Sequence, residues 1–332
     1  MNKFIPLCLL TFAFSASAAD WSEYPVPAKL DKGQTWQLDP LSDDFNYNAP
    51  AKGKSNEFFS RWKEGYIGAW SGPGKTVWEP LHSSVKDGKL VLIASRVPLD
   101  YPEKEKAGGV FAGSITSKKS VLYPIFMEAR VKFSNTVLAS DFWLLSQDST
   151  QEIDIIEHYA GDGVDIDGDG VIDNDNSYFA KKLHISNHMF IRKPFTDYQP
   201  SDKNGVFGTY YWEESRKNWR DDYVRIGTYW KSPNHIEYFV NGKWVRTITN
   251  TGYSFVNPKG KVETYQTDFN PMDKFNYNHG KGLDKPMRVI LNIEDQDWRN
   301  KRGLTPTDAD LLDDSKNNYI IDWVRFYKPI SQ

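Results

Sequence analysis

Three acidic residues lie close together at residues 151–157, where the sequence reads Gln-Glu-Ile-Asp-Ile-Ile-Glu. The isoleucines between the acids predict a β-strand, whose side chains point alternately to its two faces. A regular strand would therefore separate Glu157 from Glu152 and Asp154. A β-bulge at Ile155-Ile156 adds one residue to the strand and returns all three carboxyl groups to the same face. We predict that bulge.

Carboxyl groups crowded on one face repel each other when ionised, so at least one of them should keep its proton toward neutral pH. Hydrolysis of a glycosidic bond uses two carboxyl groups: one protonates the leaving oxygen, and the other attacks the anomeric carbon or activates water. We assign Glu152 as the nucleophile, Glu157 as the acid/base and Asp154 as the residue that orients the nucleophile. The spacing alone leaves two alternatives open, an exposed acidic strand face and a cation site.

The aromatic content of the chain fits the same chemistry. Twelve Trp, 18 Tyr and 19 Phe make up 15% of the residues, and many of them lie in polar contexts such as residues 210–212. Sugar rings have apolar C–H faces that stack on aromatic planes. A strand expected at residues 140–146 can place Trp143 beside the acids as such a platform. The composition fits a Trp-rich β core equally well, and Trp143 would then be structural.

Most of the chain shows a period of two in β-branched and aromatic residues, broken by Gly, Asn and Asp, and no long segment has helical periodicity. Asn241-Gly242 lies between two such runs and predicts a tight hairpin. We therefore predict an all-β fold, a β-sandwich of two packed antiparallel sheets. Further strands are expected at residues 89–94, 126–133, 183–189, 223–230, 287–293 and 319–327. Polar segments at 46–57, 161–176, 195–219 and 253–284 are expected to be long loops that rim a groove.

The N-terminus has the three parts of a secretory signal: Lys3, an apolar run at 4–14 and the small residues at 15–19. We predict a signal peptide at 1–19 and one secreted domain at 20–332, because no linker or repeat divides the chain. The only cysteine, Cys8, lies in the signal, which excludes disulfides from the mature protein. A net charge of −3 in a chain that is 26% charged gives no basic excess for nucleic acid or membranes. We expect a monomer without an organic cofactor.

The chain resembles the β-agarases and β-porphyranases of glycoside hydrolase family 16 over nearly its whole mature length. The segments that carry the resemblance are 65–74, 123–124 with 127–131, 142–157, 183–192, Phe195 with 197–200, 293–299 and 322–329. The three acids are typical of the wider family, whereas the His-containing segment 183–192, the Asp-Tyr-Gln-Pro run at 197–200 and segment 293–299 are typical of this branch. The resemblance implies a jelly-roll sandwich with a concave substrate cleft. It also implies a β-agarase that cleaves internal β-1,4-galactosidic bonds of agarose with retention of configuration.

The resemblance also implies site residues. Beyond the catalytic residues Glu152, Asp154 and Glu157, it implies stacking platforms at Trp70 and Trp143 and polar contacts to the sugar from His184, His188, Arg192 and Glu294. It further implies a structural calcium ion held by Asp44, the Gly88 carbonyl and Asp322. From the residues alone, each histidine could instead be structural, and Arg192 could do no more than pair with Asp197.

One segment departs from the family pattern. Residues 165–173 insert a loop with Asp165, Asp167 and Asp169 at alternate positions, which is how hard oxygen ligands gather around calcium. The closing Glu of an EF-hand is missing, because Asn176 stands there, so a flexible acidic loop is the alternative. The insertion flanks the cleft and leaves fine specificity open.

Two other functions remain to be weighed. A β-porphyranase would need a cationic pocket for sulfate, for which Arg61, Arg192 and Arg299 are the candidates. A non-catalytic galactan-binding protein on the same sandwich would be expected to lack a catalytic acid, and this chain keeps all three.

Overall fold

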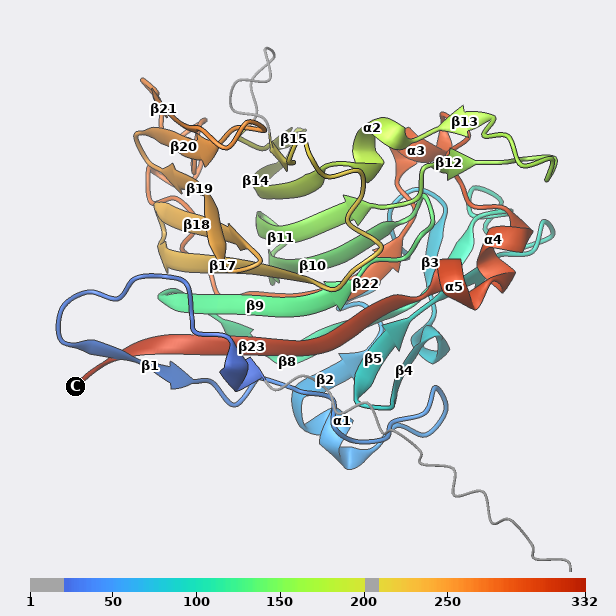
Figure 1. The fold of residues 1–332 in the computed structure, drawn as a ribbon, viewed down its shortest axis with the longest axis horizontal. Coiled ribbons are helices and arrows are strands. Elements are labelled where there is room, and N and C mark those ends of the chain that lie inside the picture. Colours follow the sequence, from blue (N-terminus) through green and yellow to red (C-terminus); the bar gives the residue numbers. More distant parts are fainter. Residues whose placement is uncertain (1–20, 201–208) are drawn as a thin grey trace, which may run out of the picture.

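Two antiparallel sheets pack against each other and form most of the structure (Figure 1). The computed structural model describes residues 21–200 and 209–332, so the predicted signal peptide at 1–19 lies outside the described residues. The larger sheet has ten strands: β21 (Val262–Gln266), β20 (Gly252–Val256), β19 (Lys243–Thr249), β18 (His235–Val240), β17 (Val224–Ser232), β9 (Ile125–Lys132), β23 (Tyr319–Ser331), β5 (Lys89–Leu92) and β4 (Ser83–Lys86) in spatial order, with β1 (Gln34–Leu38) beside β23.

The second sheet has eight strands and carries the acidic segment. Its order is β15 (Phe195–Tyr198), β14 (Leu183–Arg192), β11 (Gln151–Tyr159), β10 (Ala139–Ser146), β22 (Met287–Glu294), β8 (Ser114–Val121) and β2 (Trp62–Glu64), with β16 (Tyr210–Tyr211) beside β14. Two small sheets join β12 (Gly163–Val164) to β13 (Asn174–Asp175), and β7 (Val110–Ala112) to β3 (Thr76–Trp78) and β6 (Ala94–Arg96).

Helices are short in the described part of the chain. They are α1 (Asn56–Arg61), α2 (Ser177–Ala180), α3 (Asp297–Asn300), α4 (Asp308–Leu312) and α5 (Asp314–Asn317), with 3-10 turns at Trp21–Glu23 and Pro80–His82. None of the helices within 21–200 and 209–332 is long and apolar enough to cross a membrane. The predicted all-β sandwich is confirmed.

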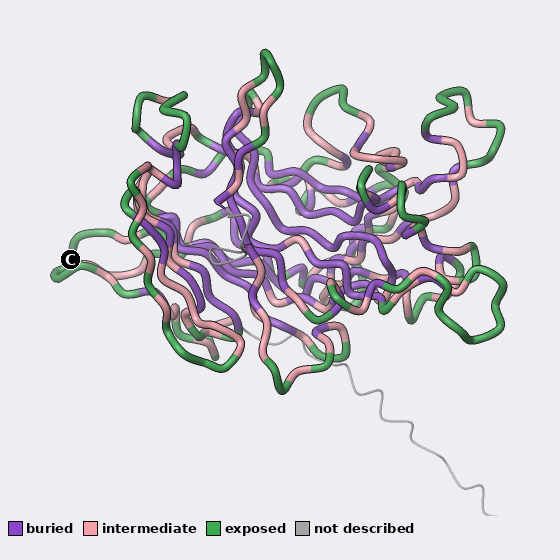
Figure 2. The backbone as a smooth tube through the Cα atoms, turned by 90° about the horizontal axis from the view of Figure 1, so that it is seen from above, coloured by how far each residue is buried: buried purple, intermediate pink, exposed green. Residues whose placement is uncertain are grey.

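Alternation along the strands separates the core from the cleft. Phe142 and Leu144 of β10 are fully buried in the main apolar cluster together with Ile153 of β11 and residues of β9 in the other sheet. Asp141 and Trp143, which alternate with them along β10, point away from the core and line a cleft. Figure 2 shows the buried backbone concentrated in the central strands and the exposed backbone in the connections. The eight-stranded sheet therefore has one apolar face in the core and one polar face toward a cleft.

The predicted hairpin at Asn241-Gly242 is confirmed, since β18 and β19 pair around it. Both turn residues have positive φ, 50° and 76°, as a two-residue type I′ connection requires. The expectation of long loops is wrong in part: segment 161–176 contains β12 and β13, the described residues of 195–219 contain β15 and β16, and 253–284 contains β21 and most of β20, while residues 201–208 lie outside the described residues. These strands lie at or near sheet edges, and β21 alternates only between exposed and half-buried residues, so they carry little apolar signal.

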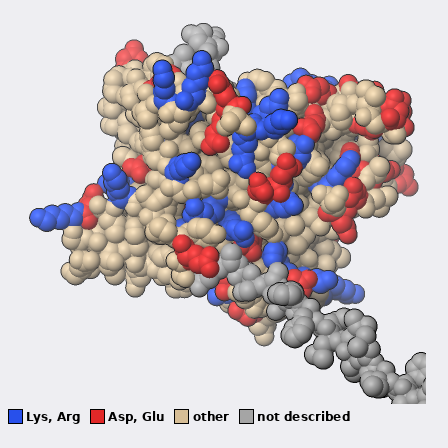
Figure 3. All heavy atoms as spheres, in the orientation of Figure 1, with Lys and Arg blue, Asp and Glu red and all other residues tan. Residues whose placement is uncertain are grey.

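The surface is mixed in charge, as the composition predicts. On the face drawn in Figure 3, basic and acidic side chains are interspersed rather than gathered into a single-sign patch.

Candidate active site

A bulge in β11 brings the three acids together. On β10, Phe142 pairs with Ile156 and Trp143 with Asp154, so Ile155 is the extra residue of β11. The register with β14 shifts at the same place, between Asp154 and Glu157. Ile155 turns into the core, where it is fully buried. The predicted bulge is therefore confirmed, and Glu152, Asp154 and Glu157 line one cleft.

The cleft has a volume of about 770 Å³ and lies over the polar face of the eight-stranded sheet. Strands β10, β11, β14 and β22 form its floor. Its lining residues include Tyr66, Trp70, Pro73, Asp141, Trp143, Glu152, Asp154, Glu157, His184, His188, Phe190, Arg192, Phe195, Asp197, Gln199, Glu294, Gln296 and Trp298. All of the catalytic and sugar-contacting residues expected from the sequence are in this set.

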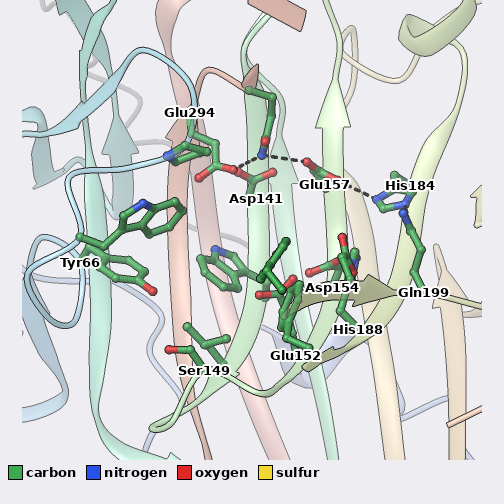
Figure 4. Close-up of a pocket in the computed structure, with 18 of the residues that line it drawn as sticks. Tyr66, Asp141, Ser149, Glu152, Asp154, Glu157, His184, His188, Gln199 and Glu294 are labelled. Carbon is green, nitrogen blue, oxygen red and sulfur yellow. Dashed lines mark hydrogen bonds and ion pairs between the residues drawn. The ribbon is translucent and has the colours of Figure 1, made fainter. Parts of the chain in front are cut away.

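Glu157 has a partner on each carboxyl oxygen. Tyr159 Oη and Gln296 Nε2 donate to Oε1, the latter at 3.2 Å, and Oε2 lies 2.8 Å from His184 Nδ1. His184 Nε2 in turn lies 3.2 Å from Gln199 Oε1 (Figure 4). Burial raises the pKa of Glu157, but the hydrogen bond and charge of His184 together with the Tyr159 hydrogen bond outweigh it and lower that pKa below its ordinary value.

The contacts of His184 fix where its proton can be. Gln199 Oε1 is an acceptor and also takes a hydrogen bond from Ser186 Oγ at 3.3 Å. A neutral His184 therefore carries its proton on Nε2 and presents a bare Nδ1, which can only accept a proton from Glu157. A cationic His184 instead donates from Nδ1 to an ionised Glu157. The 2.8 Å contact therefore lets a proton pass between Glu157 and His184.

Glu152 and Asp154 have different surroundings. No described residue donates a hydrogen bond to Glu152, and burial, followed by the charge of Asp154, raises its pKa well above the ordinary value. His188 lies behind them, with Nε2 3.1 Å from Asp154 Oδ2 and Nδ1 2.7 Å from Asp197 Oδ1. Burial alone would lower the pKa of His188, but the two carboxylates raise it well above its ordinary value. His188 is thus a cation held between Asp154 and Asp197.

Aromatic side chains form one wall of the cleft. Trp143 lies on β10 beside the acids, and its indole Nε1 donates to Asn292 Oδ1 at 2.5 Å. Tyr66 stacks on Trp143 with ring centroids 6.2 Å apart, and Trp70 meets Tyr66 edge to face at 5.3 Å. Trp70 is 49% exposed, which leaves its ring available to a ligand. The expected stacking platforms are therefore placed on the cleft wall, joined by Tyr66.

Glu294 lies at the end of β22 and lines the cleft. Asn292 Nδ2 donates to its Oε2 at 2.9 Å, and Gln296 Nε2 donates to its Oε1. Burial, followed by the charges of Glu157 and Glu152, raises the pKa of Glu294 well above its ordinary value. Gln296 therefore links Glu294 to Glu157.

Only one of the three arginines considered for a sulfate pocket reaches the cleft. Arg192 lines it, with its guanidinium 4.8 Å from the Phe190 ring centroid and a hydrogen bond to the Ser149 carbonyl. Its suggested partner Asp197 pairs with His188 instead. Arg299 is buried over the Tyr159 ring, and Arg61 lies on α1 outside the cleft lining.

The residues expected to hold calcium give a mixed result. Asp322 is buried on β23, where Oδ2 pairs with Arg130, while Oδ1 has no hydrogen-bond partner among the described residues and lies 3.9 Å from Lys89 Nζ. A buried carboxylate oxygen without a hydrogen bond is a feature that a metal ligand would have, although here the Lys89 ammonium already faces it. Asp44 is exposed, and its carboxylate accepts from the backbone and side chain of Asn46. The structural calcium site of Asp44, Gly88 and Asp322 therefore stays a prediction, in which Asp322 would be the buried ligand.

The acidic insertion forms a partly different group from the predicted one. Carboxylate oxygens of Asp165, Asp167 and Asp173 lie within 4.8 Å of one another, whereas Asp169 is not part of this group. Asp165 accepts from the backbone of Gly168 and Gly170 at 2.8 and 2.9 Å. These hydrogen bonds shape the loop without an ion, so calcium binding here also stays a prediction.

Several cleft residues were not expected from the sequence as site residues, and four of them bear on the argument: Tyr66, Asp141, Gln199 and Gln296. A signal existed for two of them. Asp141 is two residues before Trp143, and Gln296 is two residues after Glu294, so the period of two in a strand carries them to the same side as residues that were expected. Tyr66 lies in a loop and Gln199 just after the edge strand β15, so no strand periodicity in the sequence links them to an expected site residue.

A pair of carboxyl groups on one bulged strand, in an open cleft with aromatic walls, defines a glycoside hydrolase on a β-sandwich. The family model described as "Beta-porphyranase A-D, GH16 domain" matches residues 36–329. The chain belongs to glycoside hydrolase family 16.

Relatives of the chain carry agarase names. Beta-agarase AgaA of Microbulbifer thermotolerans is 49% identical over 94% of this chain and 63% of its own length. A beta-agarase of Phocaeicola plebeius is 42% identical over 98% of each chain. Beta-porphyranase B of the same organism is 25% identical over 74% of this chain and 71% of its own length.

Solved structures share the fold. The catalytic domain of PdAgaC has a TM-score of 0.86 at 40% identity, covering 95% of this chain and 98% of that one. An inactivated mutant of beta-agarase B in complex with agaro-octaose has a TM-score of 0.76 at 38% identity, covering 94% of this chain and 100% of that one. The jelly-roll sandwich implied by the family resemblance is confirmed.

Proposed function

We propose that this protein is a secreted, endo-acting β-agarase that hydrolyses β-1,4-galactosidic bonds of agarose with retention of configuration. The observation that carries the proposal is the bulge at Ile155, which turns Glu152, Asp154 and Glu157 into one open cleft between aromatic walls. An open cleft accepts a polymer in mid-chain, so cleavage of internal bonds follows. The agarase names of the relatives support agarose as the substrate.

The contacts of the two glutamates assign their roles. Glu157 lies 2.8 Å from His184 Nδ1, a contact through which a proton can pass, and this suits the group that protonates the leaving oxygen. Its lowered pKa in the empty cleft runs against the protonated state of an acid, so this assignment rests on contacts. Glu152 takes no hydrogen bond from the described residues, so its oxygens are free to approach an anomeric carbon. Its raised pKa in the empty cleft runs against the ionised state of a nucleophile, so this assignment rests on contacts and not on pKa. Asp154, paired with cationic His188, lies between them and orients Glu152.

Positions near the scissile bond follow from the same geometry. Trp143 and Trp70 would stack on sugar rings, and Arg192, Glu294 and His188 present polar groups to hydroxyls. His184 differs from the other expected contacts, because its nearest partner is Glu157 itself. Export through a signal at 1–19 and a monomeric state belong to the same proposal.

A β-porphyranase is the second candidate, because the matching family model carries that description. A sulfated sugar needs positive charge at its subsite. Arg192 is the single arginine among the described cleft-lining residues, and its guanidinium is stacked on Phe190 and bonded to Ser149. This arrangement favours the neutral polymer.

Reducing-sugar release from agarose and from porphyran, measured with the parent and with Glu152→Gln, tests the proposal. Glu237→Gln is the matched control, since Glu237 lies on β18 in the other sheet. We expect the parent and the control to act mainly on agarose and Glu152→Gln to lose activity. If the parent acts mainly on porphyran, the substrate is the sulfated galactan and not agarose. Parental activity in Glu152→Gln would refute the mechanism, and binding without hydrolysis by the parent would indicate a galactan-binding protein.

Proton NMR of fresh products tests retention. We expect the β-anomer to form first, and an initial α-anomer would indicate inversion, in which Glu152 activates water instead of attacking carbon.

A further inference from the structure

Asp141 is an acidic residue of the cleft to which the two-carboxylate mechanism gives no task. It lies on β10, directly across from Glu157 on one side and from Asn292 of β22 on the other. The side chain is only 3% exposed. It therefore adds a further carboxyl group to a site that already holds Glu152, Asp154, Glu157 and Glu294.

Asn292 connects Asp141 to two residues that contact substrate in the proposed function. The indole Nε1 of Trp143 can only donate, and it donates to Asn292 Oδ1 at 2.5 Å. This contact fixes the orientation of the amide, so that Nδ2 faces the acids. Nδ2 donates to Asp141 Oδ2 at 2.7 Å and to Glu294 Oε2 at 2.9 Å. Asn292 is itself fully buried, so water does not replace these bonds.

The surroundings of Asp141 offer no cation. None of the ion pairs found among residues 21–200 and 209–332 includes Asp141 or Glu294, and both carboxyl groups share one neutral amide donor. The second oxygen of Asp141, Oδ1, is buried without a donor among the described residues. An ionised oxygen in that position would lose its hydration without compensation, and this cost favours the protonated form.

The charged groups that face Asp141 also disfavour its ionised form. Glu157 and Asp154 face it from β11 and Glu294 from β22, and all three are acids. Tyr159 of β11 and Tyr319 of β23 are the other titratable neighbours, and both are neutral phenols. Burial and then these three acids raise the pKa of Asp141 well above its ordinary value. The pKa therefore agrees with the contacts.

We propose that Asp141 is a neutral positioning residue of the active site: a protonated carboxyl group that holds Asn292, and through it Trp143 and Glu294, without placing another negative charge beside Glu157. Figure 4 shows its place between Glu294 and Glu157. The neutral form matters for the reaction, because Glu157 becomes negative when it gives up its proton, and an ionised neighbour would oppose that step. The inference rests on the proposed function only where it concerns Trp143, Glu294 and Glu157 as substrate-handling residues.

Two variants separate charge from shape. Asp141→Asn keeps a planar, neutral group that can accept from Asn292, whereas Asp141→Leu has a similar size and no hydrogen-bonding atom. We expect Asp141→Leu to raise KM for agaro-oligosaccharides about tenfold or more, with a smaller change in kcat, because Trp143 and Glu294 lose a common support. We expect Asp141→Asn to restore KM to within about threefold of the parent value. If both variants fold and Asp141→Asn raises KM as much as Asp141→Leu does, the charge of Asp141 is required and the proposal is overturned.

A measurement without substrate completes the test. Infrared spectra of the parent minus Asp141→Asn at neutral pH should contain the C=O band of one protonated carboxylic acid. The absence of that band would overturn the proposal. Because the pKa of Asp141 is higher in the folded state than in the unfolded state, its protonated carboxyl group contributes fully to stability at a pH below the unfolded-state pKa. That contribution is lost as the pH rises through the folded-state pKa. Asp141→Asn should therefore gain Tm relative to the parent as the pH increases. An inactive parent would refute the agarase function and leave these two readouts intact.

Discussion

Replacing His184 with Ala tests the role of Glu157 in detail. The change removes the ring nitrogen 2.8 Å from Glu157 Oε2 and leaves Tyr159 and Gln296 as donors to Oε1. A hydrogen bond to a charged group contributes about 1.5–3 kcal/mol. We therefore expect kcat/KM on agarose to fall about 10- to 150-fold at the pH optimum.

The pH dependence gives the sign of the effect. His184 lowers the pKa of Glu157 against the effect of burial, so its removal raises that pKa. The alkaline limb of kcat/KM reports the loss of the general acid's proton in the free enzyme. We expect this limb to move to higher pH in His184→Ala. A shift to lower pH, or a parental rate across the whole profile, would refute the assignment of Glu157 as the proton donor.

The matched control is His235→Ala. His235 Nε2 also lies close to a carboxylate, 2.9 Å from Glu237 Oε1, but on β18 of the larger sheet and outside the cleft lining. Its pH profile should match that of the parent. Thermal unfolding of both variants separates a loss of fold from a loss of proton transfer.

Further predictions concern binding, stability and metal. Lys106 is buried and donates to the carbonyls of Gly72 and Gly74 at 2.9 and 2.8 Å, and these bonds hold the loop that carries Trp70. Lys106→Met should therefore raise KM for agaro-oligosaccharides several-fold while kcat is kept. An unchanged KM would show that the loop keeps its position without Lys106. Arg325 and Glu128 form a fully buried ion pair, so Arg325→Met should lower the free energy of unfolding by about 3–5 kcal/mol. Lys316→Met breaks a half-exposed pair with Asp310 and should lower it by less than about 1 kcal/mol. Equal losses in the two variants would contradict the burial argument. If the predicted calcium ion binds the folded state, EDTA should lower Tm, and calcium at about 100 times its Kd should restore about 2.7 kcal/mol of folding stability. If EDTA lowers the Tm of Asp322→Asn as much as that of the parent, Asp322 is not a ligand of the ion.

Local sequence was sufficient where a physical rule acts over a few residues. The Asn-Gly pair predicted the β18–β19 hairpin because its positive φ angles suit a tight turn. The bulge in β11 followed from phase, since three carboxyl groups could not otherwise share a face with isoleucines in the core. The edge strand β21 was missed because an edge buries too little surface to leave an apolar pattern.

The sequence by itself determined the strand that carries the acids, the sandwich that holds it and, through family resemblance, the residues that meet in the cleft. Only the tertiary structure decided how those residues are paired. His184 reaches Glu157 from the neighbouring strand, Gln296 joins Glu157 to Glu294, and Asn292 joins Trp143 to Asp141. Such pairs form between strands far apart in the chain, so their distances, burial and proton positions depend on sheet order and register, which no local pattern specifies.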